Sequence, residues 1–114
     1  MDTTDKKAIK KLVKLLGEVR EEHGDIPIQM LETLLQIALN EGASQLDIQN
    51  LTKQSKASSS RNIKAWSSWT RHREVGPGYI EAKPDPYEMR RNVVSLTKAG
   101  ERYLSHMAKV LREG

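Results

Sequence analysis

The stretch DPYEMRRNVVSLTKAGERYL, residues 85–104, combines a polar loop, a short apolar run at residues 92–96 and the start of an amphipathic segment. A second short run, residues 79–82, precedes the proline-containing loop at residues 83–86. Two short strands around such a loop predict a β-hairpin. Its tip is expected to display three basic side chains, with Tyr87 and Met89 nearby: Lys83, Arg90 and Arg91.

A helix is predicted directly before this hairpin. In the stretch SKASSSRNIKAW, residues 55–66, Ser55 is positioned to cap a helix that covers residues 56–69. Its inward face is expected to hold Ser59, Ile63 and Trp66, which are spaced by four and three residues. Ser58, Ser60, Arg61 and Lys64 are left pointing outward.

A shorter helix is predicted one step earlier in the chain. Residues 43–46 form a connector with room for a single β-bridge, and Asp47 resembles an N-cap. The helix that follows is expected to carry Ile48 and Leu51 toward the interior and to end near Gln54. Two short helices joined by a tight turn are therefore expected ahead of the hairpin.

Three longer helices are predicted around these elements from apolar residues at spacings of three and four. The first runs from Asp5 to about Glu22 and presents Ile9, Leu12, Val13, Leu16 and Val19. The second runs from about Pro27 and closes at Gly42, and it is expected to supply the core through Met30, Leu31, Leu34, Leu35, Ala38 and Leu39. The last is capped by Thr97 and presents Tyr103, Leu104, Met107, Val110 and Leu111.

This order of elements predicts a mainly α fold with a small β-hairpin, a winged helix-turn-helix with N- and C-terminal helices. At 114 residues with 37% hydrophobic residues, the chain suits one domain with one core. We divide residues 1–114 into an N-terminal helix (1–24), a core (25–96) that includes the wing (79–96), and a C-terminal helix (97–114).

The net charge of +4 and pI near 9.4 suit a polyanionic partner. Between Asp47 and Glu74 there is no acidic residue, whereas this interval contains Lys53, Lys56, Arg61, Lys64, Arg71 and Arg73. The start, MDTTDKKAIKK, lacks a signal-peptide pattern, and no apolar run approaches the roughly 18 residues that span a bilayer. We therefore expect a soluble cytoplasmic protein without a membrane partner.

Residues with catalytic or metal-binding chemistry form no recognisable pattern. The chain has no cysteine, and His23, His72 and His106 are too scattered for a metal motif. No serine carries a triad signature or belongs to a phosphate-binding loop. The sequence therefore predicts a protein that is not an enzyme, with no cofactor, catalytic residue or metal site.

The stretches SKASSSRNIKAW and DPYEMRRNVVSLTKAGERYL resemble the recognition helix and the wing of the MarR-like winged-helix regulators. In the wing the resemblance depends on Asp85, Arg90, Arg91, Leu96, Thr97 and Gly100, and it covers roughly residues 27–104. Two features depart from the family pattern: Gly76-Pro77-Gly78 where a Lys-Gly turn is common, and Ser59 where an apolar residue is usual. The resemblance implies a DNA-binding fold.

The candidate DNA contacts lie on the helix and the wing. Arg61 can bind guanine, Ser58 and Ser60 can bond base edges or phosphates, and Lys56 and Lys64 suit phosphates. Asn62 either reads adenine or bonds the neighbouring helix. In the wing, Lys83, Arg90 and Arg91 can reach phosphates or a narrow minor groove, and Asp85 can orient one guanidinium through a bidentate pair.

These features predict a sequence-specific regulator of transcription that binds double-stranded DNA, a repressor because a bound dimer can occlude a promoter. A homodimer is expected through the apolar faces of the first and last helices. Two alternatives remain: an architectural or replication-associated module that contacts only phosphates, and a winged-helix module that binds an acidic protein. No residue pattern identifies a small-molecule effector or an operator.

Overall fold

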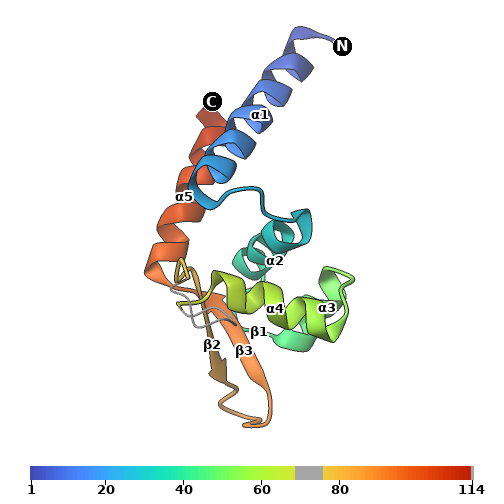
Figure 1. The fold of residues 1–114 in the computed structure, drawn as a ribbon, viewed down its shortest axis with the longest axis vertical. Coiled ribbons are helices and arrows are strands. Elements are labelled where there is room, and N and C mark those ends of the chain that lie inside the picture. The colour runs from blue at the N-terminus through green and yellow to red at the C-terminus, as the bar shows by residue number, and fades with distance from the viewer. Residues whose placement is uncertain (69–75, 114) are drawn as a thin grey trace.

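Five helices and three short strands make up the part of the chain that the computed structural model describes, residues 1–68 and 76–113 (Figure 1). Their order confirms the predicted fold class, mainly α with a small antiparallel sheet. The elements are α1 (Thr3–His23), α2 (Ile28–Leu39), β1 (Ala43–Ser44), α3 (Gln45–Leu51), α4 (Lys56–Trp66), β2 (Ile80–Pro84), β3 (Asn92–Leu96) and α5 (Lys98–Glu113).

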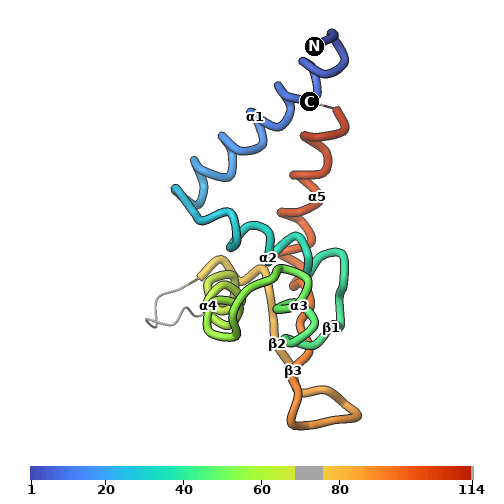
Figure 2. The backbone as a smooth tube through the Cα atoms, turned by 90° about the vertical axis from the view of Figure 1, so that its right-hand side faces the viewer, coloured from blue at the N-terminus to red at the C-terminus, as the bar shows by residue number. Residues whose placement is uncertain are grey.

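Helices α1 and α5 pack along each other and form an arm, with both termini at the end of the molecule opposite the wing tip (Figures 1 and 2). A small core joins them through Leu15 and Val19 of α1 and Met107 and Val110 of α5. Lys11 Nζ donates to the Arg112 carbonyl at 3.3 Å, so α5 ends beside the middle of α1.

Most of the apolar face predicted for α1 lies outside the core of the single chain. Val19 is buried, but Ile9, Leu12, Val13 and Leu16 remain exposed. α1 carries two apolar stripes, and α5 covers the other stripe, which contains Leu15. The periodicity locates the helix, but which stripe is covered depends on the path of α5.

The main core lies between α2, α3, α4 and the sheet. Its fully buried side chains include Leu34, Ile37, Ile48, Trp66 and Val94. In α2 the prediction is partly wrong, because Thr33, Leu34 and Ile37 are buried whereas Leu35 and Leu39 are exposed. The helix also ends at Leu39, before the predicted Gly42, because Asn40 leaves the helical conformation. The three buried residues share one face of α2, and this face, not the wider apolar surface of the helix, meets α4 and β3.

Helix α3 begins earlier than predicted. Ser44, not Asp47, is the N-cap: its hydroxyl accepts from Asp47 N–H at 3.1 Å, and the Asp47 carboxylate accepts from Ser44 N–H at 3.3 Å. This reciprocal capping box places Asp47 at the third helical position. Ile48 is buried as predicted, but Leu51, the last residue of α3, is exposed.

The predicted β-bridge exists as β1, which pairs with the hairpin to give the strand order β1-β3-β2. Strand β3 has the predicted bounds, whereas β2 extends to Pro84, which pairs with Asn92. Lys83 and Pro84 therefore belong to a strand and not to the loop. Thr97 caps α5 as predicted, because its hydroxyl accepts from Gly100 N–H at 3.1 Å.

Four rings connect the arm to the rest of the molecule. His23, at the end of α1, meets the rings of Trp66, Tyr79 and Tyr103 edge-on at centroid distances of 5.2–5.5 Å. The Tyr79 hydroxyl and His23 Nε2 lie 3.2 Å apart. Trp66 is fully buried, and its Nε1 donates to the Met30 carbonyl at 2.6 Å, which confirms its predicted place in the core.

Candidate nucleic-acid interface

Helix α4 starts at a well-formed cap. The Ser55 hydroxyl accepts from Ser58 N–H at 3.1 Å, which satisfies one of the free donors of the first turn. The helix ends at Trp66, before the predicted Trp69, because Ser67 adopts an extended conformation there. Trp69 itself lies outside the described residues. The predicted inward face is confirmed, since Ser59, Ile63 and Trp66 are all buried.

The outward face of α4 is polar and partly basic. Lys56, Arg61 and Lys64 are exposed, and Ser58 and Ser60 are half-buried. Arg61 Nη2 donates to Ser58 Oγ at 3.2 Å, so the guanidinium rests over the first turn of its own helix. Arg61 is exposed, and a guanidinium has five donors, so a base edge or a phosphate can accept from it as well.

Asn62 turns away from this face. Its side chain is half-buried, and Nδ2 donates to Gln54 Oε1 at 2.5 Å. This contact agrees with the interpretation in which Asn62 bonds a neighbouring element, although Gln54 lies in the turn before α4 and not in a helix. To read adenine, Asn62 would have to direct both its amide nitrogen and its amide oxygen at the base while Nδ2 keeps its bond to Gln54.

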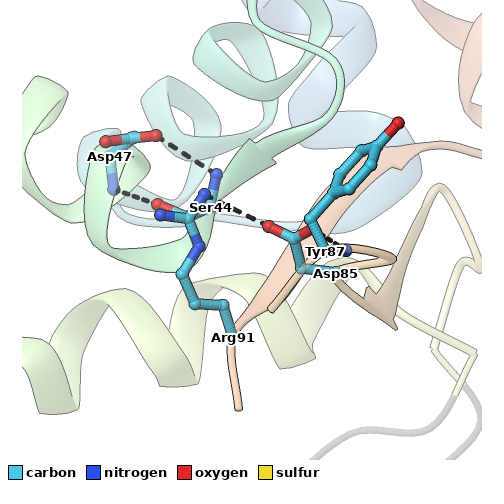
Figure 3. Close-up of polar contacts among 5 residues, drawn as sticks. All are labelled: Ser44, Asp47, Asp85, Tyr87 and Arg91. Atoms are coloured by element: carbon cyan, nitrogen blue, oxygen red, sulfur yellow. Dashed lines mark hydrogen bonds and ion pairs between the residues drawn. The ribbon is translucent and has the colours of Figure 1, made fainter. Parts of the chain in front are cut away.

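The wing is organised around Asp85, which is only 8% exposed at the end of β2. In Figure 3, its two carboxylate oxygens go to different partners: Oδ2 lies 3.3 Å from Arg91 Nη2, and Oδ1 accepts from Tyr87 N–H at 2.9 Å. The predicted pairing with one guanidinium is present, but it is not bidentate. The carboxylate therefore fixes both the arginine and the backbone of the loop.

The other candidate residues of the wing are more loosely held. Lys83 Nζ forms a 3.2 Å ion pair with Glu81 on the same strand, and both side chains are exposed. Arg90 is exposed at the tip. Tyr87 is 98% exposed and Met89 is 79% exposed, so two large side chains are displayed on the loop beside the arginines.

The fold thus brings the candidate residues onto two separate elements. Both α4 and the wing lie away from the end that holds the termini, and the wing projects beyond the helices (Figure 1). A protruding hairpin and a neighbouring helix have the dimensions to enter two adjacent features of a duplex. Arg71 and Arg73, which contribute to the basic interval, lie outside the described residues.

Sequence reasoning missed a buried polar cluster beneath this surface. It consists of Thr33, Thr52 and Gln54, and Asn62 bonds to it from α4. The available signal was Thr33 inside the most apolar helix, directly before Leu34 and Leu35. Polar residues at inward-facing helix positions are usually hydrogen-bonded to one another or to the backbone.

Within the described ranges, no group of three or more histidine, aspartate or glutamate residues is placed to hold a metal ion. The helices described here include none that is both long and apolar enough to cross a membrane.

A scan against protein-family models finds no match, and no curated protein matches the chain. Solved structures do match. The S. aureus MepR–DNA complex aligns at a TM-score of 0.71 and 16% identity over 98% of this chain and 85% of that one. A mutant MarR from E. coli complexed with operator DNA aligns at a TM-score of 0.67 and 18% identity over 95% of this chain and 71% of that one. The repressor CouR, bound to a 23-mer duplex, aligns at 0.67 and 14% identity over 96% and 68%.

The fold is that of the MarR-like proteins. The resemblance predicted from the α4 and wing stretches is therefore confirmed at the level of the fold. One predicted departure has a clear place in this MarR-like fold: Ser59 is buried, and among the described residues its hydroxyl has no hydrogen-bond partner.

Proposed function

We propose that this protein binds double-stranded DNA in a sequence-specific manner and regulates transcription, as a repressor. The observation that carries the proposal is the pair of basic elements, α4 and the wing, exposed away from the end of the molecule that holds the termini. The likeness to MepR, MarR and CouR structures that contain DNA supports it. Residues 25–96 are proposed as the DNA-binding core.

In this proposal the two elements have different roles. Arg61 contacts a guanine edge in the major groove, while Lys56, Lys64, Ser58 and Ser60 contact phosphates or nearby base edges. The wing reaches the adjacent minor groove or backbone through Arg91, which Asp85 holds, with Arg90 and Lys83 beside it. Asn62 contributes a base contact only through the part of its amide that Gln54 leaves open.

We propose that the protein acts as a homodimer through its arm. The exposed stripe of Ile9, Leu12, Val13 and Leu16 is a surface that a second copy would cover, and Leu111 of α5 is exposed as well. The charges of α1 favour an antiparallel arrangement, since its first half carries lysines and its second half Glu18, Glu21 and Glu22. Two recognition helices would then meet one duplex about 34 Å apart.

Selection of bound duplexes from a random pool, at about physiological salt and with excess nonspecific competitor, tests the proposal. An enriched inverted repeat supports a dimeric, sequence-specific regulator. Recovery of no motif despite salt-sensitive binding favours the phosphate-contacting module. Absence of binding contradicts every DNA-based function and favours a protein-interaction module.

Single substitutions then test the division of roles. Arg61→Ala is expected to reduce preference for the selected duplex, whereas Arg91→Ala should weaken binding to all sequences and reduce the salt slope by about one. Lys109→Ala is the control, because Lys109 is an exposed basic residue on the arm. Equal losses on every duplex from the first two variants would contradict the assigned roles.

A further inference from the structure

Gln54 connects three helices from a buried position in the turn between α3 and α4. Its side chain is 8% exposed. Nε2 donates to Thr33 Oγ1 of α2 at 2.8 Å and to Thr52 Oγ1, at the end of α3, at 2.7 Å. Oε1 accepts from Asn62 Nδ2 of α4 at 2.5 Å. One amide therefore bonds to every helix of the helix-turn-helix.

The chemistry of the partners allows only one orientation of this amide. The Thr33 hydroxyl donates its hydrogen to the Gln29 carbonyl at 2.7 Å, and the Thr52 hydroxyl donates to the Ile48 carbonyl at 2.7 Å. A hydroxyl has a single hydrogen, so both groups can only accept from Gln54. The NH2 group must face the threonines, and the carbonyl oxygen must face Asn62, which then has to donate.

The backbone around Gln54 is fixed as well. Lys53 adopts a φ of 52°, the left-handed region that non-glycine residues rarely occupy, and Gln54 N–H donates to the Gln49 carbonyl at 3.1 Å. Ser55, the next residue, caps α4. The side chain of Gln54 and the start of α4 are thus held by adjacent residues.

A polar cluster constrains a helix differently from an apolar contact. Apolar side chains tolerate small sliding movements, whereas a buried hydrogen bond is lost when its donor and acceptor separate. Rotation of α4 would break the bond between Gln54 and Asn62, and Asn62 is the immediate neighbour of Arg61. The orientation of the exposed face of α4 is therefore coupled to the buried amide.

We propose that Gln54 is a positioning residue for DNA sequence discrimination. It touches no DNA; it holds α4 through Asn62 at the angle that brings Arg61 to a base edge. This inference rests on the proposed function. Contacts with phosphates depend on charge and tolerate small changes of angle, so they should survive when Gln54 is replaced.

The test uses the full chain and two duplexes, the one enriched by wild type and a scrambled version of it. Gln54→Met keeps the length of the side chain but removes all three hydrogen bonds. The ratio of the two Kd values is expected to fall about tenfold, the scale of one lost base-pair preference, while the salt slope stays the same. Gln45→Met, the same replacement in α3 outside the cluster, should leave the ratio unchanged.

Thr52→Val gives an independent result if Gln54→Met does not fold, because valine has the shape of threonine without the hydroxyl. It should lower the same ratio by a smaller factor. A folded variant that keeps the full ratio, or one that loses affinity equally for both duplexes, overturns the positioning role. If the wild-type protein enriches no motif, the proposed function and this inference both fail. If the wild-type protein enriches a motif and both variants keep the full ratio of Kd values, the inference alone fails.

Discussion

The arm and the helix-turn-helix distribute polarity in opposite ways. Along α1 of the arm, the apolar side chains of Leu12 and Leu16 are each 48% exposed. In the helix-turn-helix, the polar side chains of Thr33, Thr52 and Gln54 are buried. Apolar residues are usually covered and polar residues are usually solvated, so each region departs from the ordinary pattern in its own direction.

The two departures have different physical meanings. Exposed apolar area on the arm gains free energy when another surface covers it, at roughly 25 cal/mol per Å². Buried polar groups gain no free energy from further burial. They stabilise the fold only when a hydrogen-bond partner lies at the right distance and angle, so they favour one arrangement of the helices. The arm is therefore suited to association, and the helix-turn-helix is suited to holding one geometry.

A matched pair of leucine substitutions gives the largest expected effect. Leu34 is fully buried in the main core, so Leu34→Ala should lower the free energy of unfolding by about 2–5 kcal/mol. Leu12→Ala should change it by less than about 0.5 kcal/mol at concentrations where the protein is monomeric. Urea denaturation measures both changes.

The two variants should also differ in self-association. Analytical ultracentrifugation is expected to show weaker association for Leu12→Ala and an unchanged constant for the folded fraction of Leu34→Ala. If Leu12→Ala destabilises the monomer as much as Leu34→Ala does, the exposed stripe of α1 has a structural role within one chain, and the contrast between the regions fails.

The fold was largely predictable because its signals are local. The spacing in residues 56–66 predicts the buried face of α4, and the β3 strand and the Thr97 cap follow from short patterns. The errors arise where one helix offers more than one apolar stripe, as α1 does around Leu15. Which stripe becomes buried depends on a distant element, and no local pattern records its path.

The candidate site was predictable in residue type but not in contacts. The basic residues of α4 and the wing are visible as a charge pattern, whereas the role of Gln54 depends on partners 21 residues before it and 8 residues after it. The same limit applies to Asp85. Its pairing with one guanidinium follows from the wing pattern, but the single contact with Arg91 and the bond from Tyr87 N–H to the other carboxylate oxygen depend on the shape of the loop.

A pair of glycine substitutions tests where the two regions join. A Cβ on Gly100 would lie 2.2 Å from the Tyr79 carbonyl oxygen, so α5 and the segment before β2 would have to separate. Gly100→Ala should therefore lower the free energy of unfolding by about 1–3 kcal/mol. A Cβ on Gly17 of α1 meets no atom within 4 Å.

Gly17→Ala is the control, since alanine favours a helix more than glycine does. It should raise stability by about 0.5–1 kcal/mol. Thermal unfolding followed by circular dichroism should show a lower Tm for Gly100→Ala and a higher Tm for Gly17→Ala. A rise in Tm for Gly100→Ala would mean that the close approach of α5 to Tyr79 is not maintained in solution.

A smaller effect is expected at the cap of α5. The Thr97 hydroxyl accepts from Gly100 N–H at 3.1 Å and also donates to the Gly78 carbonyl at 2.5 Å, so it joins the arm to the segment before the wing. Thr97→Ala should lower the free energy of unfolding by about 1 kcal/mol. Thr97→Ser keeps the hydroxyl, so it should keep most of this stabilisation. Equal losses in the two variants would assign the effect to the methyl group instead.

The smallest effect is a fall in stability at alkaline pH, which arises where the ring of Tyr103 connects the arm to the rest of the molecule. Burial raises the pKa of Tyr103 to about 12, and Glu22, Tyr79 and Glu18 add to this rise. In the unfolded chain the tyrosine pKa is about 10. The folded state therefore holds the phenolic proton more tightly, so the stability linked to Tyr103 is complete below about pH 10 and is lost as the pH rises toward about 12.

Tyr103→Phe separates this ionisation from packing. Among the described residues the Tyr103 hydroxyl has no hydrogen-bond partner, so its removal should change stability by less than about 0.5 kcal/mol at neutral pH. Between about pH 9 and pH 11 the urea midpoint of the variant should fall less than that of wild type. Part of the fall will remain, because burial and Glu22 also raise the pKa of Tyr79. An identical fall in both proteins would mean that Tyr103 is solvated in the folded state, and that the arm packs less closely at this junction than the ring distances indicate.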